Sequence, residues 1–224
     1  RWQHPKQGLL PPDLFLPLAE KTGLIIPIGN WVIDEACRQL REWHLQGHTD
    51  WSMAVNLSTL QFEQPSLVKT VLDCLTRHSV PPGMLILEVT ETTAMSNPDE
   101  SVRVLTALTD AGVKASIDDF GTGYSSLLYL KRLPACELKI DRAFVKELSG
   151  ESEDATIVSA IVALAKTLNL KVVAEGVETA AQQTFLTELG CNTLQGYLLG
   201  KPITAQAIME QCQHGEMSPP RAQS

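Results

Sequence analysis

The sequence predicts an incomplete (β/α) barrel, an α/β fold in which parallel strands alternate with helices. Short apolar or β-branched runs alternate with longer runs of helical spacing along the 224 residues. Such alternation is typical of parallel strands joined by right-handed crossovers. In addition, each strand-like run ends in a polar residue, and barrel enzymes gather residues of this kind at one rim.

Six runs are expected to form strands, and they share β-branched or apolar composition. In chain order they are Trp51–Leu57, Met84–Thr90, Val113–Asp118, Glu137–Ile140, Lys171–Ala174 and Thr193–Leu194. A closed barrel has about eight strands. The shortfall indicates either an open doubly wound sheet or further strands that precede Arg1. Because all six strand ends carry a polar residue, and not only those near one switch point, a ring is favoured.

Helical patterns lie between these strands. Asp99–Ala111 and Glu153–Leu168 are expected to be helical. In the second, apolar residues recur at steps of three and four, which gives one apolar stripe. Gly47, Gly112 and Gly190 each follow a periodic run, and glycine is favoured just after a helix ends. We therefore expect helices to close at these three positions.

Composition limits the class of protein. The 18 Lys+Arg and 26 Asp+Glu residues give a net charge of −8, which disfavours general binding to a nucleic-acid polymer. A phosphate substrate would therefore need metal ions or a few placed cations. The hydrophobic fraction of 44% excludes disorder for most of the chain, and no apolar run approaches the length of a membrane span. The five cysteines are far apart without a Cys-x-x-Cys pair, so we expect a reducing, cytoplasmic location.

The chain is expected to form one domain. We find no internal linker, repeat or low-complexity segment before the end of the sequence. The last residues are rich in Pro, Ser and Gln and are expected to be mobile. The predicted boundaries are 1–212 for the domain and 213–224 for the tail.

The polar residues at the six strand ends form the candidate site. They are Asn56, Glu88, Asp118 with Asp119, Lys139, Glu175 and Gln195. Carboxylate and carboxamide oxygens suit Mg²⁺ or Mn²⁺, and the adjacent aspartates are well placed to hold two ions. Two such ions can activate a water and stabilise the leaving oxygen of a phosphodiester. Lys139 can orient the water or offset charge on the phosphorus oxygens, and Gln195 can bond the water or a substrate oxygen.

Each of these residues also has an ordinary structural interpretation. A lone acid at a strand end is more often a helix N-cap or a loop contact than a ligand, and two adjacent aspartates can form a turn. Glu91 follows Glu88 by three residues, and ordering a loop beneath the site or capping a helix are equally compatible with that spacing. The conjunction of six strand ends favours the functional interpretation.

Several motifs resemble those of bacterial EAL domains, the cyclic di-GMP phosphodiesterases. The most specific is Ser116–Leu127, which reads SIDDFGTGYSSL and resembles the central loop of that family. The other motifs follow in the family's order: RWQHP at 1–5, VNLS at 55–58, LEVTE at 87–91, LKIDR at 138–142, AEGVE at 174–178 and QGY at 195–197. The similarity extends from Arg1 to about Met209.

The resemblance implies a modified TIM-like barrel that hydrolyses cyclic di-GMP to linear pGpG with two Mg²⁺ or Mn²⁺ ions. By motif, the ligands of one ion are Asn56, Glu88 and Asp118. Those of the second are Asp118, Asp119 and Glu175. Glu175 is also a candidate base, Lys139 resembles the water-orienting lysine, and Gln195 resembles the glutamine near the nucleophile.

The resemblance also assigns residues outside the metal set. Arg1 resembles an arginine that contacts a substrate phosphate, and Asp141 is expected to bind substrate as well. Glu91 resembles the glutamate that steadies the loop from Asp118 to Ser125. Because this loop and the following helix lie near a dimer interface in the family, we expect a homodimer.

One departure from the family concerns the start of the chain. The Glu-Ala-Leu signature, whose glutamate is a ligand of the first metal, is expected just before Arg1, together with the preceding strand. A chain without that glutamate is expected to be weakly active or inactive. The parent protein is expected to carry an upstream sensor or cyclase domain, and upstream segments could anchor it to a membrane. Two alternatives stay open: a non-catalytic cyclic di-GMP receptor or regulatory domain, and a pure dimerisation element without metal dependence.

Overall fold

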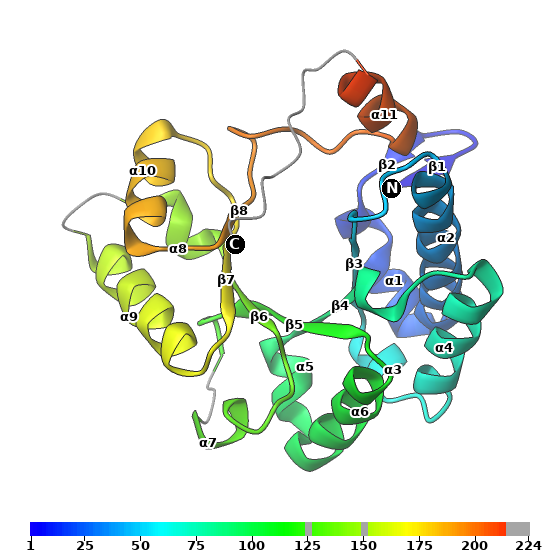
Figure 1. The fold of residues 1–224 in the computed structure, drawn as a ribbon, viewed down its shortest axis with the longest axis horizontal. Helices are drawn as coiled ribbons and strands as arrows, with labels where there is room; N and C mark the ends of the chain where they lie inside the picture. The colour runs from blue at the N-terminus through cyan, green and yellow to red at the C-terminus, as the bar shows by residue number, and fades with distance from the viewer. Residues whose placement is uncertain (124–126, 149–151, 214–224) are drawn as a thin grey trace.

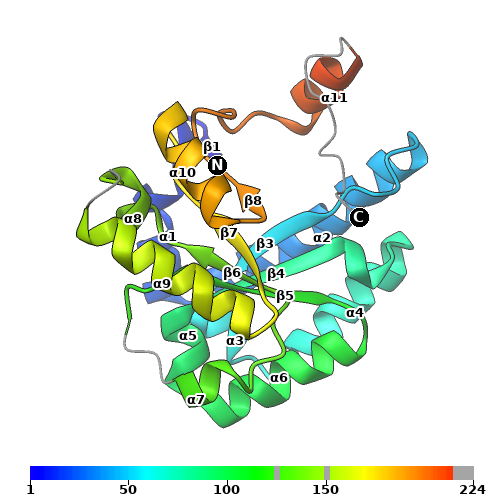
Figure 2. The same ribbon diagram turned by 60° about the vertical axis from the view of Figure 1, so that its left-hand side comes forward.

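A computed structural model describes residues 1–123, 127–148 and 152–213. Its centre is a six-stranded parallel sheet with the order β3-β4-β5-β6-β7-β8. The strands are β3 (Met53–Leu57), β4 (Leu85–Thr90), β5 (Lys114–Phe120), β6 (Glu137–Ile140), β7 (Lys171–Ala174) and β8 (Thr193–Leu194). Figure 1 shows these strands curled into an arc with helices on its outer side, and Figure 2 shows the same half-barrel from another side. The predicted α/β fold with a curled parallel sheet is confirmed.

The strand boundaries agree closely with the predictions, and the main difference is in β5. This strand continues beyond the predicted end at Asp118, because Phe120 pairs with Ile140 of β6 after a shift in register. The shift falls between Ile117 and Phe120, and Asp119 within it has a left-handed φ of 54°. The two adjacent aspartates therefore lie in an irregular strand end and not in a turn.

Most of the helices lie on the outer side of the arc (Figure 1). They are α1 (Leu16–Thr22), α2 (Ile25–Leu45), α3 (Thr59–Phe62), α4 (Leu67–His78), α5 (Glu91–Ser96), α6 (Pro98–Asp110), α7 (Leu127–Leu130), α8 (Arg142–Lys146), α9 (Glu153–Thr167), α10 (Ala180–Leu189) and α11 (Ala205–Gln213). The predicted helices correspond to α6 and α9 within one residue at each end. Gly47, Gly112 and Gly190 follow α2, α6 and α10 with positive φ, as expected for residues that end helices.

An N-terminal hairpin was not predicted. Its strands, β1 (Trp2–His4) and β2 (Gly8–Leu10), pair antiparallel and form a sheet of their own. The turn between them is held by His4, whose Nδ1 accepts hydrogen bonds from the backbone N–H groups of Lys6 and Gln7. Its strands are too short to show periodicity and precede the alternation of strands and helices, so the sequence gives little sign of this hairpin.

The alternation of side chains along the strands separates the core from the site. In β4, Leu85, Leu87 and Val89 are completely buried in the apolar core, and Glu88 points to the opposite face. In β6, Leu138 and Ile140 belong to the core and Lys139 lies between them in sequence. Polar groups of neighbouring strands therefore share the inner face of the arc.

Two further predictions concern the ends of the chain and membranes. The predicted mobile tail, 213–224, falls outside the described residues except for Gln213, the last residue of α11. None of the described helices is long and apolar enough to cross a membrane.

Candidate active site

Lys139 lies at the centre of the polar cluster on the inner face of the sheet. Its Nζ is 3.0 Å from Glu88 Oε2 of β4, 3.0 Å from Asp118 Oδ1 of β5, and 2.7 Å from Glu175 Oε1 directly after β7. The lysine is 4% exposed. Since the carboxyl ends of parallel strands meet at one edge, four strand ends deliver one ammonium and three carboxylates to the same place.

Burial and neighbouring charges shift the pKa values of Glu88 and Lys139 in opposite directions. Burial raises the pKa of the Glu88 carboxyl, and the Lys139 ammonium works against that rise. Burial by itself would lower the pKa of Lys139. The hydrogen bond to Glu175 and the negative charges of Glu88 and Asp118 outweigh burial and raise it. Lys139 is therefore a fixed cation at neutral pH.

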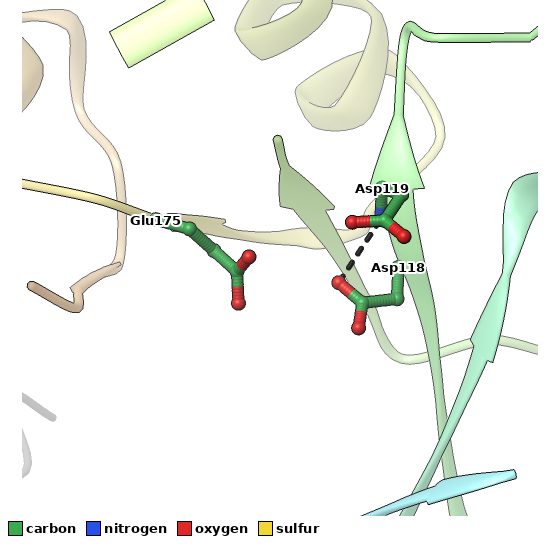
Figure 3. A group of neighbouring side chains, drawn as sticks. All are labelled: Asp118, Asp119 and Glu175. Carbon is green, nitrogen blue, oxygen red and sulfur yellow. Dashed lines mark hydrogen bonds between the residues drawn. The ribbon is translucent and has the colours of Figure 1, made fainter. Parts of the chain in front are cut away.

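Asp118, Asp119 and Glu175 form a second group that overlaps the first. Each contributes a carboxylate oxygen, and these oxygens all lie within 4.8 Å of one another. Figure 3 shows the Glu175 carboxylate directed toward the two aspartates. Successive side chains of a regular strand point to opposite faces. The register shift and the left-handed φ of Asp119 break that rule here, so both aspartates reach the same space.

The backbone and the carboxyl of Asp119 each have a specific partner. The Asp119 N–H donates a hydrogen bond of 2.9 Å to Asp118 Oδ1, which orients that carboxylate. Burial raises the pKa of the Asp119 carboxyl to about 6, and the Asp118 charge and a hydrogen bond with Asp141 add to the rise. Carboxylates that lie this close repel one another when ionised, which favours uptake of a proton. A bound cation would remove the repulsion and keep the carboxylates ionised.

The donor set fits a divalent cation. Glu88, Asp118, Asp119 and Glu175 bring four carboxylates to the cluster against the single ammonium of Lys139. All of these donors are oxygens, which is the ligand chemistry that Mg²⁺ and Mn²⁺ prefer. The excess of negative charge is what a divalent ion would neutralise.

Two predicted residues, Asn56 and Gln195, border the cluster. Asn56 of β3 is in register with Glu88 of β4, and paired residues of neighbouring strands point to the same face. Gln195 follows β8, and its N–H donates to Ala174 O (2.8 Å) while its carbonyl accepts from Val177 N–H (3.0 Å). These bonds place Gln195 beside the segment that carries Glu175, with an exposed side chain.

Arg1 and Asp141 are the two predicted substrate-binding residues. Arg1 precedes β1 and is exposed, and among the described residues it forms no ion pair with the cluster. Asp141 caps α8, because its Oδ1 accepts a hydrogen bond from Ala143 N–H at 2.6 Å. Its carboxyl also lies close enough to contribute to the raised pKa of the Asp119 carboxyl. Asp141 can therefore cap α8 and still be a candidate for substrate binding.

Glu91 contacts the segment that follows β5. It is 2% exposed, and its Oε2 accepts a hydrogen bond of 2.8 Å from Gly121 N–H. A Cβ on Gly123 would lie 2.9 Å from Glu91 Oε1, so the loop passes very close to this carboxylate. Residues 124 and 125 of the predicted Asp118–Ser125 loop are outside the described part of the chain.

Gln182 of α10 was not predicted, although its sequence context carries a signal. Thr179 and Gln182 form a reciprocal capping box at the start of α10, and the Thr-x-x-Gln spacing is the pattern of that motif. The residue is 5% exposed, and the capping box directly follows the segment that begins with Glu175.

Comparison with known proteins identifies the family. The sequence model of the EAL domain family matches residues 1–202. This chain belongs to the EAL domain family. The bifunctional diguanylate cyclase/cyclic di-GMP phosphodiesterase MucR of Pseudomonas aeruginosa is 65% identical over 209 residues, which cover 93% of this chain and 30% of MucR. The cyclic di-GMP phosphodiesterase NbdA of the same species is 47% identical over 210 residues, which cover 94% of this chain and 27% of NbdA.

Solved structures agree with this assignment. The structure of the PaMucR phosphodiesterase in complex with c-di-GMP has a TM-score of 0.91 at 65% identity, and the match covers 93% of this chain and 84% of that one. The EAL domain of Mycobacterium smegmatis DcpA has a TM-score of 0.78 at 38% identity, with 84% of each chain covered. This EAL domain therefore spans less than a third of the length of MucR and NbdA and most of the two solved chains.

Proposed function

We propose that this EAL domain hydrolyses cyclic di-GMP to linear pGpG with two divalent ions, Mg²⁺ or Mn²⁺. The observation that carries the proposal is the buried Lys139 ammonium among three carboxylates, beside the group of Asp118, Asp119 and Glu175. Two relatives are named as cyclic di-GMP phosphodiesterases, and a solved structure with a TM-score of 0.91 is a c-di-GMP complex.

The proposed metal ligands follow the strand ends. Asn56, Glu88 and Asp118 would hold one ion, and Asp118, Asp119 and Glu175 would hold the other. When bound, such ions stabilise charge on phosphate oxygens and lower the pKa of water. The register shift in β5 supports this division, because it lets Asp118 and Asp119 serve neighbouring positions.

The chain's own residues supply the other groups that the reaction needs. The Lys139 ammonium is held in place by three carboxylates, so it can hydrogen-bond the attacking water or a phosphate oxygen without losing binding energy to reorganisation. Glu175 is the proposed base, and Gln195, from the adjacent segment, is proposed to bond the water. Arg1 and Asp141 are proposed substrate contacts.

Glu91 and the assembly of the domain complete the proposal. The Glu91 carboxylate would hold the Gly121–Gly123 segment against the site through its bond to Gly121 N–H.

The proposed homodimer is supported by α7, which follows this loop and exposes Leu127 and Leu128 by 59% and 69%. The proposed domain boundaries are 1–212 and 213–224. Because the relatives are much longer, an upstream sensor or cyclase domain and a cytoplasmic location are also proposals.

Product analysis tests the function directly. Purified protein is incubated with cyclic di-GMP and Mg²⁺, Mn²⁺ or EDTA, and pGpG is quantified by chromatography. We expect release that depends on the divalent ion. The assay uses both the 224-residue chain and a chain extended at its N-terminus, because the resemblance predicts a further glutamate ligand before Arg1.

Variants distinguish hydrolysis from the alternatives. Asp118→Ala and Lys139→Ala should each reduce pGpG release by at least about 100-fold, whereas Asp50→Ala, at an exposed loop position, should not. An unchanged rate in either site variant would contradict the role given to that residue. Tight calorimetric binding of cyclic di-GMP without cleavage in the extended chain would favour a receptor, and no metal dependence at all would favour a dimerisation element.

A further inference from the structure

We propose that Gln182 is a positioning residue for Glu175, and this inference rests on the proposed function. Gln182 touches neither the carboxylate cluster nor Lys139. Its carboxamide instead joins the segment that follows Glu175 to the end of α8, the helix that begins three residues after Lys139. It would therefore set the distance between two strand ends that meet in the site.

All four hydrogen-bonding positions of the Gln182 carboxamide are used. Its Oε1 accepts from the backbone N–H groups of Glu178 (2.8 Å) and Thr179 (2.9 Å). Its Nε2 donates to the carbonyls of Val145 (2.9 Å) and Lys146 (3.2 Å) at the end of α8. The side chain is 5% exposed, so water does not replace these partners easily.

The two joined segments are also in close steric contact. Gly176 has a φ of 72°, and a Cβ at this position would lie 2.6 Å from Arg142 Cβ. Glu175 is therefore followed at once by backbone packed against the first residue of α8. At the other end of the segment, Gln182 fixes the same helix at Val145 and Lys146. These two attachments are six residues apart along the segment and at most four apart along α8, so they leave the segment little freedom to tilt.

The segment that follows Glu175 also contacts the residues that follow β8. Val177 N–H donates to Gln195 O at 3.0 Å, and Leu198 N–H donates to Val177 O at 3.0 Å. A Cβ on Gly196 would lie 2.1 Å from Val177 O, so the two backbones are in direct contact. A shift of the segment that Gln182 holds would therefore move both Glu175 and Gln195.

Only a carboxamide fits this position well. A methionine has a similar length but would leave the N–H groups of Glu178 and Thr179 without their acceptor and would remove the Gln182 donor from two carbonyls. Of these two carbonyls, Val145 O keeps a bond from Leu148 N–H. A glutamate would keep the two acceptor bonds to Glu178 and Thr179 but would face the carbonyls of Val145 and Lys146 without a donor when ionised. Gln182→Glu thus removes the link to α8 and keeps the link to the capping box, with almost no change in shape.

The consequence for chemistry follows from the position of Glu175. This carboxylate contacts Lys139 at 2.7 Å and belongs to the group that would hold a metal ion. Displacements of about 1 Å in such a site reduce turnover on the order of 100-fold. We therefore expect the loss of Gln182 to lower kcat and weaken metal binding, and to change KM for cyclic di-GMP much less.

The experiment compares Gln182→Glu and Gln182→Met with the same substitutions at Gln183, the next residue of α10. Turnover of cyclic di-GMP is measured against substrate and against Mn²⁺ concentration, and Mn²⁺ binding to the protein alone is measured by calorimetry. We expect kcat to fall about tenfold to 100-fold and the Mn²⁺ dissociation constant to rise several-fold in both Gln182 variants. The Gln183 variants should match the unmodified chain.

A second control separates positioning from loss of stability. Val71→Ala removes methyl groups from a fully buried core position in α4, far along the sheet from β7. It should lower Tm without changing kcat or Mn²⁺ affinity well below Tm. Should the Gln182 variants behave like Val71→Ala, with normal kcat and normal Mn²⁺ binding, the inference is overturned.

The two proposals fail in different ways. Absence of cyclic di-GMP cleavage by the unmodified chain and the extended chain would refute the proposed function, and the calorimetric comparison would still test whether Gln182 positions the carboxylates. Normal cleavage and normal Mn²⁺ affinity in Gln182→Glu would refute the positioning role and leave the proposed function intact.

Discussion

Asp119→Asn should stabilise the metal-free protein at pH 8, although it removes a proposed metal ligand. Asparagine has the shape of aspartate and tolerates the left-handed φ of 54° at this position. What changes is the charge, which in the folded protein lies close to Asp118 and Glu175. The substitution therefore separates the electrostatic cost of the crowded carboxylates from their use in metal binding.

The sign and size follow from the pKa of Asp119. Burial, followed by the Asp118 charge, raises it from 3.8 to about 6 in the folded protein. Between these values the folded state binds more protons than the unfolded state, so stability falls as pH rises from about 4 to about 6 and stays lower above that range. A difference of about two pH units would correspond to about 3 kcal/mol, which partial exposure of the group reduces to about 1 kcal/mol.

The assay is thermal unfolding in EDTA at pH 8 and at pH 5. At pH 8, Asp119→Asn should raise Tm by about 2–4 °C, and at pH 5 the gain should be smaller. Asp50→Asn changes the net charge equally at an exposed position and should leave Tm nearly unchanged. With Mn²⁺ added, the order should reverse, because the unmodified chain gains more from the ion. A Tm gain that is absent at pH 8, or equal at both pH values, would refute this reasoning.

Three further predictions concern single residues. Lys139→Met should destabilise the metal-free protein by about 3 kcal/mol in urea unfolding, because it leaves buried carboxylates without their cation; a loss below about 1 kcal/mol would contradict this. Gly196→Ala should cost at least about 2 kcal/mol by the same measurement, because its Cβ would overlap Val177 O, and an unchanged midpoint would show that the backbones can separate. Glu91→Ala should lower pGpG release about tenfold with little change in Mn²⁺ binding, because Gly121 N–H loses its acceptor, and normal release would argue against the loop role.

Local sequence patterns anticipated the regular elements best. β6, β7 and β8 have the predicted bounds, because each stands at a regular place in the alternation of strands and helices. The β1–β2 hairpin was not predicted, because its short strands precede that alternation. The end of β5 was misplaced because a register shift depends on pairing with Ile140, which is distant in sequence.

The sequence predicted some residues of the candidate site and not others. Polar residues at strand ends pointed to Glu88, Asp118, Lys139 and Glu175, and the structure brings these four together. It does not bring Arg1 into ionic contact with them in the described part of the chain, and it gives Asp141 a capping role beside its contact with Asp119. Gln182 was overlooked, because its partners Val145 and Lys146 are brought to it only by the packing of α8 against α10.

The chemical groups at the end of each strand could be predicted from local sequence, because alternation along a strand and helix signals between strands are local properties. Which of those groups meet depends on how the strands and helices pack together. The left-handed backbone of Asp119, the central place of Lys139 and the link through Gln182 all depend on contacts between segments far apart in the chain. Such contacts are set by packing and hydrogen bonding of the whole sheet, for which a single segment carries no local signal.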